Sequence, residues 1–307
     1  MQVVKTAAGD LPAELISRVN SGPFMSGVGF ARLWESVGGR AVYWVVRQDN
    51  EVVAALPGDE FGRPPLTRFQ SMPDGCYGTP LVFSDTIDVP SVIRMLLKGV
   101  AEAGYLRTYL IDFNATLGTP EGFDATEAST LVVDGLGSDW QPPDKKLQSE
   151  LRKAEREGIN IERFDRQRHF AGLISLVKAT ESRHGRSPKY PPVFYEALAK
   201  LAEQDDRVVW LHVEHEGQAA ASHIYFIEGD QLLHWQAYFD KKFSFLKPNP
   251  ALMSAAIEIA VSCGITKLNM GATPLDAASL AMYKEKWGGH EYRYPCYEKR
   301  SWLGRWL

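Results

Sequence analysis

The sequence contains few cysteines, and none of them has the spacing that holds a metal or a redox centre. Its 307 residues include three cysteines, Cys76, Cys263 and Cys296, which lie far apart and form no CxxC pair. This set predicts neither a zinc ribbon nor a thioredoxin-type site, and the odd count argues against a disulfide framework. We therefore expect a reducing, cytoplasmic environment and no bound metal.

Long apolar runs and catalytic signature motifs are also missing. No run approaches the roughly 18 apolar residues that span a bilayer, and the first residues contain no apolar signal segment. HExxH, GxSxG and Walker loops are absent. A net charge of −4 argues against a general nucleic-acid binder, because such proteins carry a basic excess. We expect any lipid-linked substrate to be met at the membrane surface, on the inner face.

The composition that remains is that of a globular protein with enough apolar side chain for a real core. Apolar residues make up 45% of the chain and charged residues 23%. At roughly 100–200 residues per domain, the length predicts two domains. Residues 134–144 combine glycines, prolines and acids between periodic segments and form the best linker. We predict a first domain over residues 1–140 and a second over 141–307.

Hydrophobic periodicity predicts a mixed α/β fold for the second half of the chain. Charged and apolar helices are expected over Lys145–Glu157, Phe170–Arg183 and Val193–Glu203. A strand meander follows over Arg207–Glu214, Ala219–Ile227 and Gln231–Tyr238, then a helix over Ala251–Cys263, a strand over Lys267–Met270, a helix over Leu275–Trp287 and a strand over Glu291–Glu298. In the first half, the runs 41–47 and 51–56 predict a hairpin.

One crossover unit in this order predicts the place of a binding site. A right-handed connection through the helix Ala251–Cys263 makes the strands on either side of it parallel. The rest of the sheet is antiparallel, so neighbouring strands part at one point and leave a crevice. Crevices at such points are favoured ligand sites in α/β sheets.

Four segments of the second half resemble FemAB-like proteins, which are tandem members of the GNAT (GCN5-related N-acetyltransferase) superfamily. The segments are KKLQSELRKAEREGINI, TESRHGRSPKYPPVFYEAL, KPNPALMSAAIEIAVSCGITKLNMGAT and LAMYKEKWGGHEY. The pieces RAVYWVVRQDNEVVAALPG and SMPDGCYGTPL resemble the family's first domain. The resemblance implies two tandem acetyltransferase-like domains, of which the first is degenerate.

The family implies two classes of acyl donor. Fem peptidyltransferases transfer an amino acid from aminoacyl-tRNA to an amine of a cell-wall precursor, whereas other members use acyl-CoA. The family's glycine-rich loop for the CoA pyrophosphate is missing here, and residues 245–250 (FLKPNP) take its place. Two prolines in this segment remove backbone N–H donors, which predicts weaker pyrophosphate binding. Lys247, and the helix N-terminus that follows with Asn249, remain as the groups that meet the donor.

Acyl transfer to an amine needs a proton acceptor for the amine and a proton for the leaving group. The resemblance implies that Tyr283 lies near the leaving thiolate and protonates it. His223 and His234, on neighbouring strands, are the candidates for the general base, because imidazole titrates near neutrality. A buried tyrosine or a strand histidine is equally compatible with a role in the core.

Further polar residues around the predicted crevice are candidates for binding. Asn269 and Lys286 are expected on the donor side, with Lys284 as a second lysine that could meet a phosphate. His184, which follows a helix, and Gln236 and Tyr238, which share one face of an aromatic strand, are expected to contact the acceptor. Surface or core roles remain open for each of these residues.

The sequence therefore predicts an N-acyltransferase that moves an acyl group from acyl-CoA onto an amine of an envelope or polysaccharide precursor. Aminoacyl-tRNA is the alternative donor, and a catalytically degenerate scaffold is a second alternative. The basic run of the helix Lys145–Glu157 alternates with acids, which is typical of a solvated helix as well as of a tRNA contact.

Overall fold

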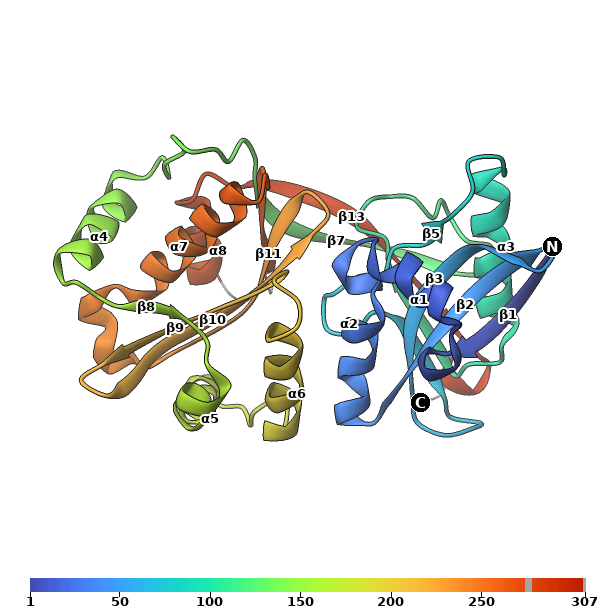
Figure 1. Cartoon of the computed structure of the whole chain (residues 1–307), viewed down its shortest axis with the longest axis horizontal. Coiled ribbons are helices and arrows are strands. Elements are labelled where there is room, and N and C mark those ends of the chain that lie inside the picture. Colours follow the sequence, from blue (N-terminus) through green and yellow to red (C-terminus); the bar gives the residue numbers. More distant parts are fainter. Residues whose placement is uncertain (274–277, 306–307) are drawn as a thin grey trace. The chain divides into compact units, whose positions relative to one another are not determined.

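The computed structural model describes residues 1–273 and 278–305, and the chain divides into two compact units (Figure 1). Unit 1 comprises Met1–Ala128 and Arg293–Leu307, and unit 2 comprises Ser129–Tyr292. These two units are defined by contacts in space, and unit 1 includes residues from both ends of the chain, whereas the predicted domains are continuous segments of sequence. The division into 1–140 and 141–307 therefore remains a prediction.

Unit 1 is built on a sheet with the order β1-β2-β3-β4-β6-β13, in which β5 also pairs with β3. The predicted hairpin is confirmed, with its two central residues Asp49 and Asn50 both at positive φ, as a tight hairpin turn requires. No strand is predicted at the N-terminus, yet β1 forms there because it pairs along β2. The strands are β1 (Gln2–Ala7), β2 (Gly39–Gln48), β3 (Glu51–Phe61), β4 (Arg68–Ser71), β5 (Leu81–Val82), β6 (Arg107–Ile111), β7 (Asp124–Val133) and β13 (His290–Arg300).

Helix α3 (Val89–Glu102) buries the apolar face of this sheet. Its residues Val92, Leu96 and Val100 recur at helical spacing and are fully buried against β2 and β3. The helices α1 (Ala13–Asn20) and α2 (Val28–Leu33) belong to the same unit. Unit 1 thus has its own apolar core.

Unit 2 contains the predicted meander and crossover. Its strands follow the order β7-β12-β11-β10-β9-β8, antiparallel except that β11 and β12 are parallel. This confirms the parallel pair that the crossover predicted. The strands are β8 (Ile161–Arg163), β9 (Val208–His215), β10 (Gln218–Glu228), β11 (Gln231–Phe239) and β12 (Lys267–Ala272).

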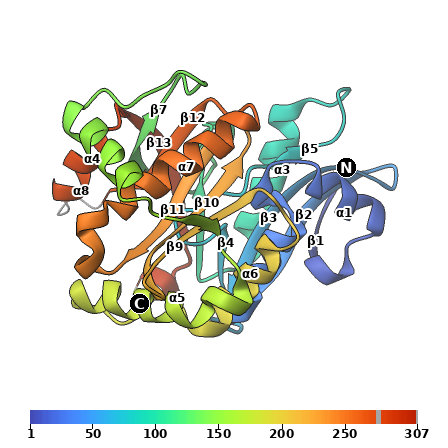
Figure 2. The same cartoon turned by 60° about the vertical axis from the view of Figure 1, so that its left-hand side comes forward.

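Helices cover both faces of the sheet of unit 2 (Figures 1 and 2). The crossover helix α7 (Pro248–Ser262) packs on β9 and β10 and is itself covered by α4 (Lys145–Arg156). On the other face lie α5 (Arg166–Arg183) and α6 (Pro192–Ala202). Because α7 lies between the sheet and α4, its apolar residues extend around much of its circumference.

Side-chain caps set the ends of two of these helices. The Asp144 carboxylate accepts a hydrogen bond from the Leu147 N–H at 2.7 Å, and α4 begins where predicted. Helix α5 begins at Arg166 rather than at the predicted Phe170, because Asp165 caps two backbone N–H groups there. The last helix, α8, covers Ala278–Glu285. Residues 275–277 of its predicted range lie outside the described residues.

Candidate active site

Strands β11 and β12 part company after three paired positions. Their parallel register runs from Gln231 and Lys267 to Leu233 and Asn269 and ends there. On the other side of β11, Tyr225 pairs with His234 and Ile224 with Gln236, so Trp235 is an extra residue in the strand. Such a bulge turns the strand and redirects the side chains beside it.

Gly271 allows the chain to leave β12 at this point. Its φ is +69°, and a Cβ atom there would lie 2.9 Å from the backbone oxygen of His234. Only glycine adopts this conformation readily and also tolerates so close a backbone. Gly271 and the bulge at Trp235 are therefore what allow the two strands to separate.

A cleft of about 950 Å³ opens where the strands diverge, within unit 2. Its lining has three cationic side chains: Arg183 at the end of α5, Arg186 in the loop that follows, and Lys284 on α8. Arg186 is paired with Glu181 at 3.1 Å. No Asp or Glu lines the cleft among the described residues. The remaining lining residues are Thr180, His184, His223, His234, Trp235, Ala237, Phe239, Asn249, Met270, Gly271, Ala272, Ser279, Leu280 and Tyr283.

His223 is held between two partners that fix its neutral form. Asn249 Oδ1 is an acceptor 3.2 Å from His223 Nε2, so Nε2 carries the proton and donates it. His223 Nδ1 then accepts from the Tyr225 hydroxyl at 2.9 Å. Burial lowers the pKa of His223 to about 4, and the hydrogen bond to Asn249 opposes this only in part.

His234 and Tyr283 have polar atoms without partners in the same cleft. The Nε2 of His234 and the hydroxyl of Tyr283 are buried and have no hydrogen-bond partner. Burial, with His223 and Lys284 nearby, holds the pKa of His234 well below its ordinary value, and burial raises the pKa of Tyr283. A buried polar atom left unpaired costs about 1–3 kcal/mol. Both ring nitrogens of His212, away from the cleft, are unpaired as well, so it is the position of His234 and Tyr283 in the cleft lining that makes them candidates.

Lys284 places a positive charge at the edge of the cleft. Its ammonium donates to the backbone oxygens of Gly271 at 2.6 Å and Ala272 at 3.0 Å, and to Thr273 Oγ1 at 2.9 Å. Only 4% of the residue is exposed, and burial lowers its pKa to about 8. The lysine ties α8 to the end of β12, and no carboxylate of the residues that the structure describes is recorded as its partner.

The cleft is lined by five of the ten residues assigned a catalytic or binding role from the sequence, His184, His223, His234, Asn249 and Tyr283, and also by Lys284, the second lysine considered there. It does not collect the other five. Lys247 pairs with Glu150 at 3.1 Å, and Asn269 is buried, its amide oxygen accepting from Thr130 Oγ1 at 2.9 Å. The roles assigned to all ten residues remain predictions.

Gln236, Tyr238 and Lys286 also lie outside the cleft lining. Gln236 and Tyr238 share a face of β11 as expected, and the Tyr238 hydroxyl is hydrogen bonded to that of Tyr195 at 2.8 Å. Lys286 follows the end of α8. Sequence reasoning missed Arg183 and Arg186, although their position at a helix end before a loop was a usable signal.

The start of α7 has few groups for a pyrophosphate. Two of its first three residues are Pro248 and Pro250, so only Asn249 carries a backbone N–H in that stretch. Lys247, at a φ of +57°, is bound to Glu150. Weaker pyrophosphate binding at this helix start remains a prediction.

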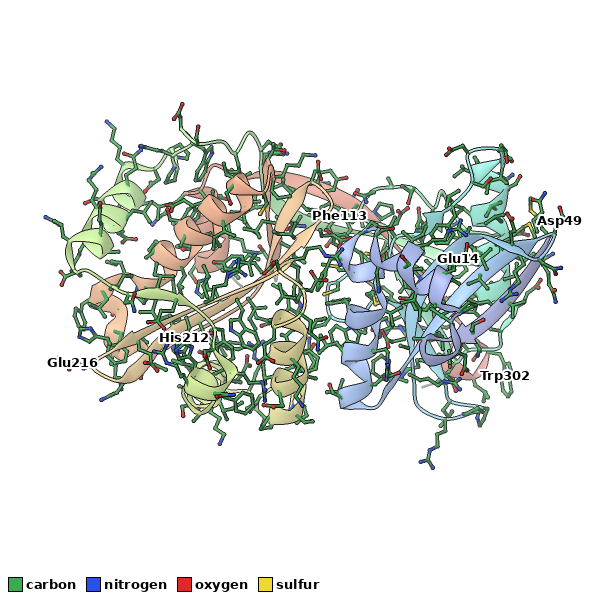
Figure 3. All side chains as sticks on the ribbon, viewed as in Figure 1. Glu14, Asp49, Phe113, His212, Glu216 and Trp302 are labelled. Atoms are coloured by element: carbon green, nitrogen blue, oxygen red, sulfur yellow. The ribbon has the colours of Figure 1, made fainter. Side chains whose placement is uncertain are left out.

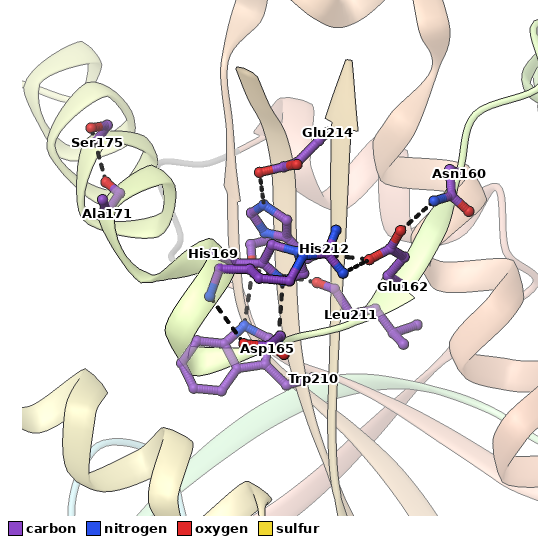
Figure 4. A network of polar contacts seen from close by, with 12 residues as sticks. Asn160, Glu162, Asp165, His169, Ala171, Ser175, Trp210, Leu211, His212 and Glu214 are labelled. Atoms are coloured by element: carbon purple, nitrogen blue, oxygen red, sulfur yellow. Dashed lines mark hydrogen bonds and ion pairs between the residues drawn. The ribbon is translucent and has the colours of Figure 1, made fainter. Parts of the chain in front are cut away.

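A second polar network surrounds two buried histidines at the β8–β9 edge of the sheet of unit 2 (Figure 4). His169 of α5 and His212 of β9 stack at 4.5 Å, with Glu162 3.7 Å from His169 Nε2 and Glu214 3.9 Å from His212 Nε2. Neither histidine lines the cleft. Within residues 1–273 and 278–305, no three His, Cys, Asp or Glu side chains are grouped so as to hold a metal ion.

The described helices were also compared with the length and hydropathy of a membrane span. None of them is both long enough and apolar enough to cross a bilayer.

Comparison with known proteins identifies a domain in the second half of the chain. Residues 144–285 match the model of the acetyltransferase (GNAT) domain. No curated protein matches the chain significantly.

Several solved structures share the fold over almost the whole chain. The crystal structure of FemX has a TM-score of 0.71 at 13% identity and covers 96% of this chain and 97% of that one. L-PGS from Bacillus licheniformis has 0.61 at 17% identity, over 95% and 93%. A tandem GNAT protein from the clavulanic acid biosynthesis pathway has 0.57 at 14%, over 97% and 98%. Residues 144–285, which match the acetyltransferase (GNAT) domain, contain the residues that line the cleft, so this part of the chain is a GNAT acyltransferase domain.

Proposed function

We propose that this chain transfers an acyl group onto an amine of an envelope or polysaccharide precursor, and that the reaction takes place in the cleft of unit 2. The observation that carries the proposal is the pair of buried, unpartnered polar atoms, His234 Nε2 and the Tyr283 hydroxyl, at the point where β11 and β12 part. Both residues line the cleft, and among the described residues no hydrogen-bond partner holds these two atoms as Tyr225 and Asn249 hold the ring nitrogens of His223.

The proposed step is direct attack of the amine on the acyl carbonyl. The amine nitrogen forms the new C–N bond, and the bond from the carbonyl carbon to the donor's sulfur or oxygen breaks. His234 Nε2 takes the proton lost by the nitrogen, and the Tyr283 hydroxyl protonates the leaving thiolate or alkoxide. The high pKa of Tyr283 keeps it protonated at neutral pH, as a proton donor must be.

The charge of the cleft favours an anionic donor. Arg183 lies over the ring of Phe239 and bonds its carbonyl at 3.2 Å, with no carboxylate partner among the described residues. Lys284 is likewise bound only to uncharged oxygens. Acyl-CoA, the donor typical of the family, and aminoacyl-tRNA both carry phosphates that such cations attract.

A specific observation favours aminoacyl-tRNA as the second candidate donor. Two prolines at the start of α7 and the ion pair of Lys247 with Glu150 reduce the groups available to hold the CoA pyrophosphate. The fold shared with FemX fits the same alternative. The acceptor is the same in both cases, an amine.

The donor is tested by thermal melting followed by turnover. A ligand at about 100 times its Kd stabilises the folded state by about 2.7 kcal/mol, which is a clear upward shift in Tm. We expect acetyl-CoA to raise Tm and to acylate a panel of amino sugars and peptide amines.

The same panel is then offered with aminoacyl-tRNA. A Tm shift and amide formation with aminoacyl-tRNA, but not with acetyl-CoA, would select the second donor. If neither donor shifts Tm or forms an amide, the proposed acyl transfer is wrong and the chain is a binding protein.

A further inference from the structure

Three arginines stand side by side at one end of the sheet of unit 1. Arg68 of β4 pairs in register with Arg107 of β6, and Arg107 pairs with Arg300 of β13. Residues opposite each other on neighbouring strands place their side chains on the same face, about 5 Å apart. Like charges so close destabilise a sheet, so this row calls for an explanation beyond folding.

Apolar side chains flank the row on both sides. The backbone N–H of Leu106 donates to Thr67 and its carbonyl accepts from Ser301, which brings the chain on either side of these residues together. The neighbouring residues Leu66 and Trp302 are 49% and 72% exposed, unusually high values for such side chains. Figure 3 shows Trp302 at the surface of unit 1.

The charge of this surface is positive. Glu298 bonds both Arg107 and Arg300, and Asp124 lies close enough to Arg300 to act on its charge. Arg68 has no ion-pair partner among the described residues. Neither has Arg63, which shares a tight turn with Leu66 through a 2.7 Å hydrogen bond. Four guanidinium groups against two carboxylates leave a net positive surface with Trp302 and Leu66 at its rim.

We propose that this surface, formed by Arg63, Leu66, Arg68, Arg107, Arg300 and Trp302, docks onto an anionic lipid bilayer. Tryptophan is enriched at the level of lipid headgroups, where its ring is half apolar and its N–H meets water. The arginines beside it meet lipid phosphates, and each arginine adds about the same electrostatic attraction to the anionic surface. A nucleic acid would be attracted by the same charges, but it offers no apolar layer for Leu66.

The arrangement also explains why the arginines are tolerated. Phosphates of a bilayer surface would neutralise the row of arginines. Before docking, the Glu298 carboxylate bonds both Arg107 and Arg300 and reduces the repulsion between their guanidinium groups. This docking does not depend on the proposed acyl transfer, because binding to vesicles needs no turnover.

Vesicle flotation of the full chain tests the proposal. Vesicles of phosphatidylcholine alone are compared with vesicles that also contain phosphatidylglycerol. We expect binding only to the anionic vesicles, with a blue shift of tryptophan emission that Trp302→Phe removes. Arg68→Gln should weaken binding about fivefold. Trp302→Ser should weaken it at least about tenfold, since it removes a large apolar side chain from the interface.

Two matched variants on α3 serve as controls for charge and for apolar exposure. Arg94→Gln removes another exposed arginine of unit 1, and Val89→Ser removes a 41% exposed apolar residue. Both should float with the vesicles as the unaltered chain does. Absence of binding to anionic vesicles, equal binding to both vesicle types, or equal losses in the controls would overturn the proposal. So would binding to tRNA that falls in Arg68→Gln and Trp302→Ser while vesicle binding does not.

Discussion

Unit 2 contains two pairs of stacked, buried histidines, and they differ in one instructive way. His223 and His234 stack at 5.0 Å across β10 and β11, and His169 and His212 stack at 4.5 Å across α5 and β9. Burial lowers the pKa of His223 to about 4 and that of His212 to about 3. Both pairs also have buried ring nitrogens without a hydrogen-bond partner, Nε2 of His234 in the first and both nitrogens of His212 in the second. By ring contact, by pKa and by these unpaired nitrogens, the two pairs look alike.

Their surroundings separate them. The first pair lines a cleft that contains cations and no described carboxylate, whereas the second faces the carboxylates of Glu162 and Glu214 and lines no part of that cleft. A depressed histidine pKa therefore reports burial, not function. Access for a ligand and the charge of the cavity distinguish a site of chemistry from a packed pair.

The largest expected effect is on turnover when the cleft loses its proton donor. Tyr283→Phe should lower kcat by about 10²–10³, within the range for loss of a general acid. Its stability should stay the same or rise by up to about 1 kcal/mol, because the hydroxyl that is removed has no partner. Steady-state kinetics and denaturant unfolding measure the two quantities. His212→Phe, at the other pair, should leave kcat unchanged, and an equal loss there would erase the distinction between the pairs.

The next effect is on acid stability and belongs to the second pair. His212 has a folded pKa of about 3, below the unfolded value near 6.5, so the unfolded chain binds the proton more readily. The folded state therefore loses stability as pH falls below about 6.5, by up to about 1.4 kcal/mol per pH unit. His212→Phe should flatten this part of the pH–stability curve. Unfolding in urea between pH 7 and pH 5 tests it, and parallel curves for both proteins would contradict the assignment.

Sequence reasoning succeeded where local signals decide structure. The turn at Asp49-Asn50, the capping Asp144 and the glycine after α7 mark ends that the structure reproduces, and the crossover predicts the parallel pair β11 and β12. The crevice followed from that pair.

What the sequence could not predict depends on partners far along the chain. Lys247 was expected to face a donor, but Glu150, 97 residues earlier, takes its ammonium. Asn269 was expected at the crevice, but Thr130 and the backbone of Gly271 satisfy its side chain inside the fold. The bulge at Trp235 also has no local signature, yet it decides which residues of β11 face the cleft. Strand β1 owes its existence to pairing with β2.

A smaller effect should appear in the pH dependence of the reaction. Burial lowers the pKa of Lys284 to about 8, so its charge is lost as pH rises through that value. If the charge attracts an anionic donor, kcat/KM should fall above about pH 8, approaching tenfold per pH unit, and Lys284→Met should abolish this limb. The matched variant Lys200→Met, on the exposed face of α6, should keep it. A limb that persists in Lys284→Met would assign the titration to another group.

The smallest expected effect comes from placing a carboxylate beside the pair His223 and His234, as the pair His169 and His212 already has. Asn249→Asp would place a carboxylate 3.2 Å from His223 Nε2, where the wild-type amide oxygen now accepts. An adjacent anion favours the imidazolium, so the pKa of His223 should rise by about one to three pH units, visible in an NMR titration of its ring proton. Because a protonated His223 would repel both Lys284 and an incoming ammonium, acyl transfer should weaken at low pH only. If the titration does not move, the introduced carboxylate does not lie beside Nε2, and the contact between residue 249 and His223 is not made in solution.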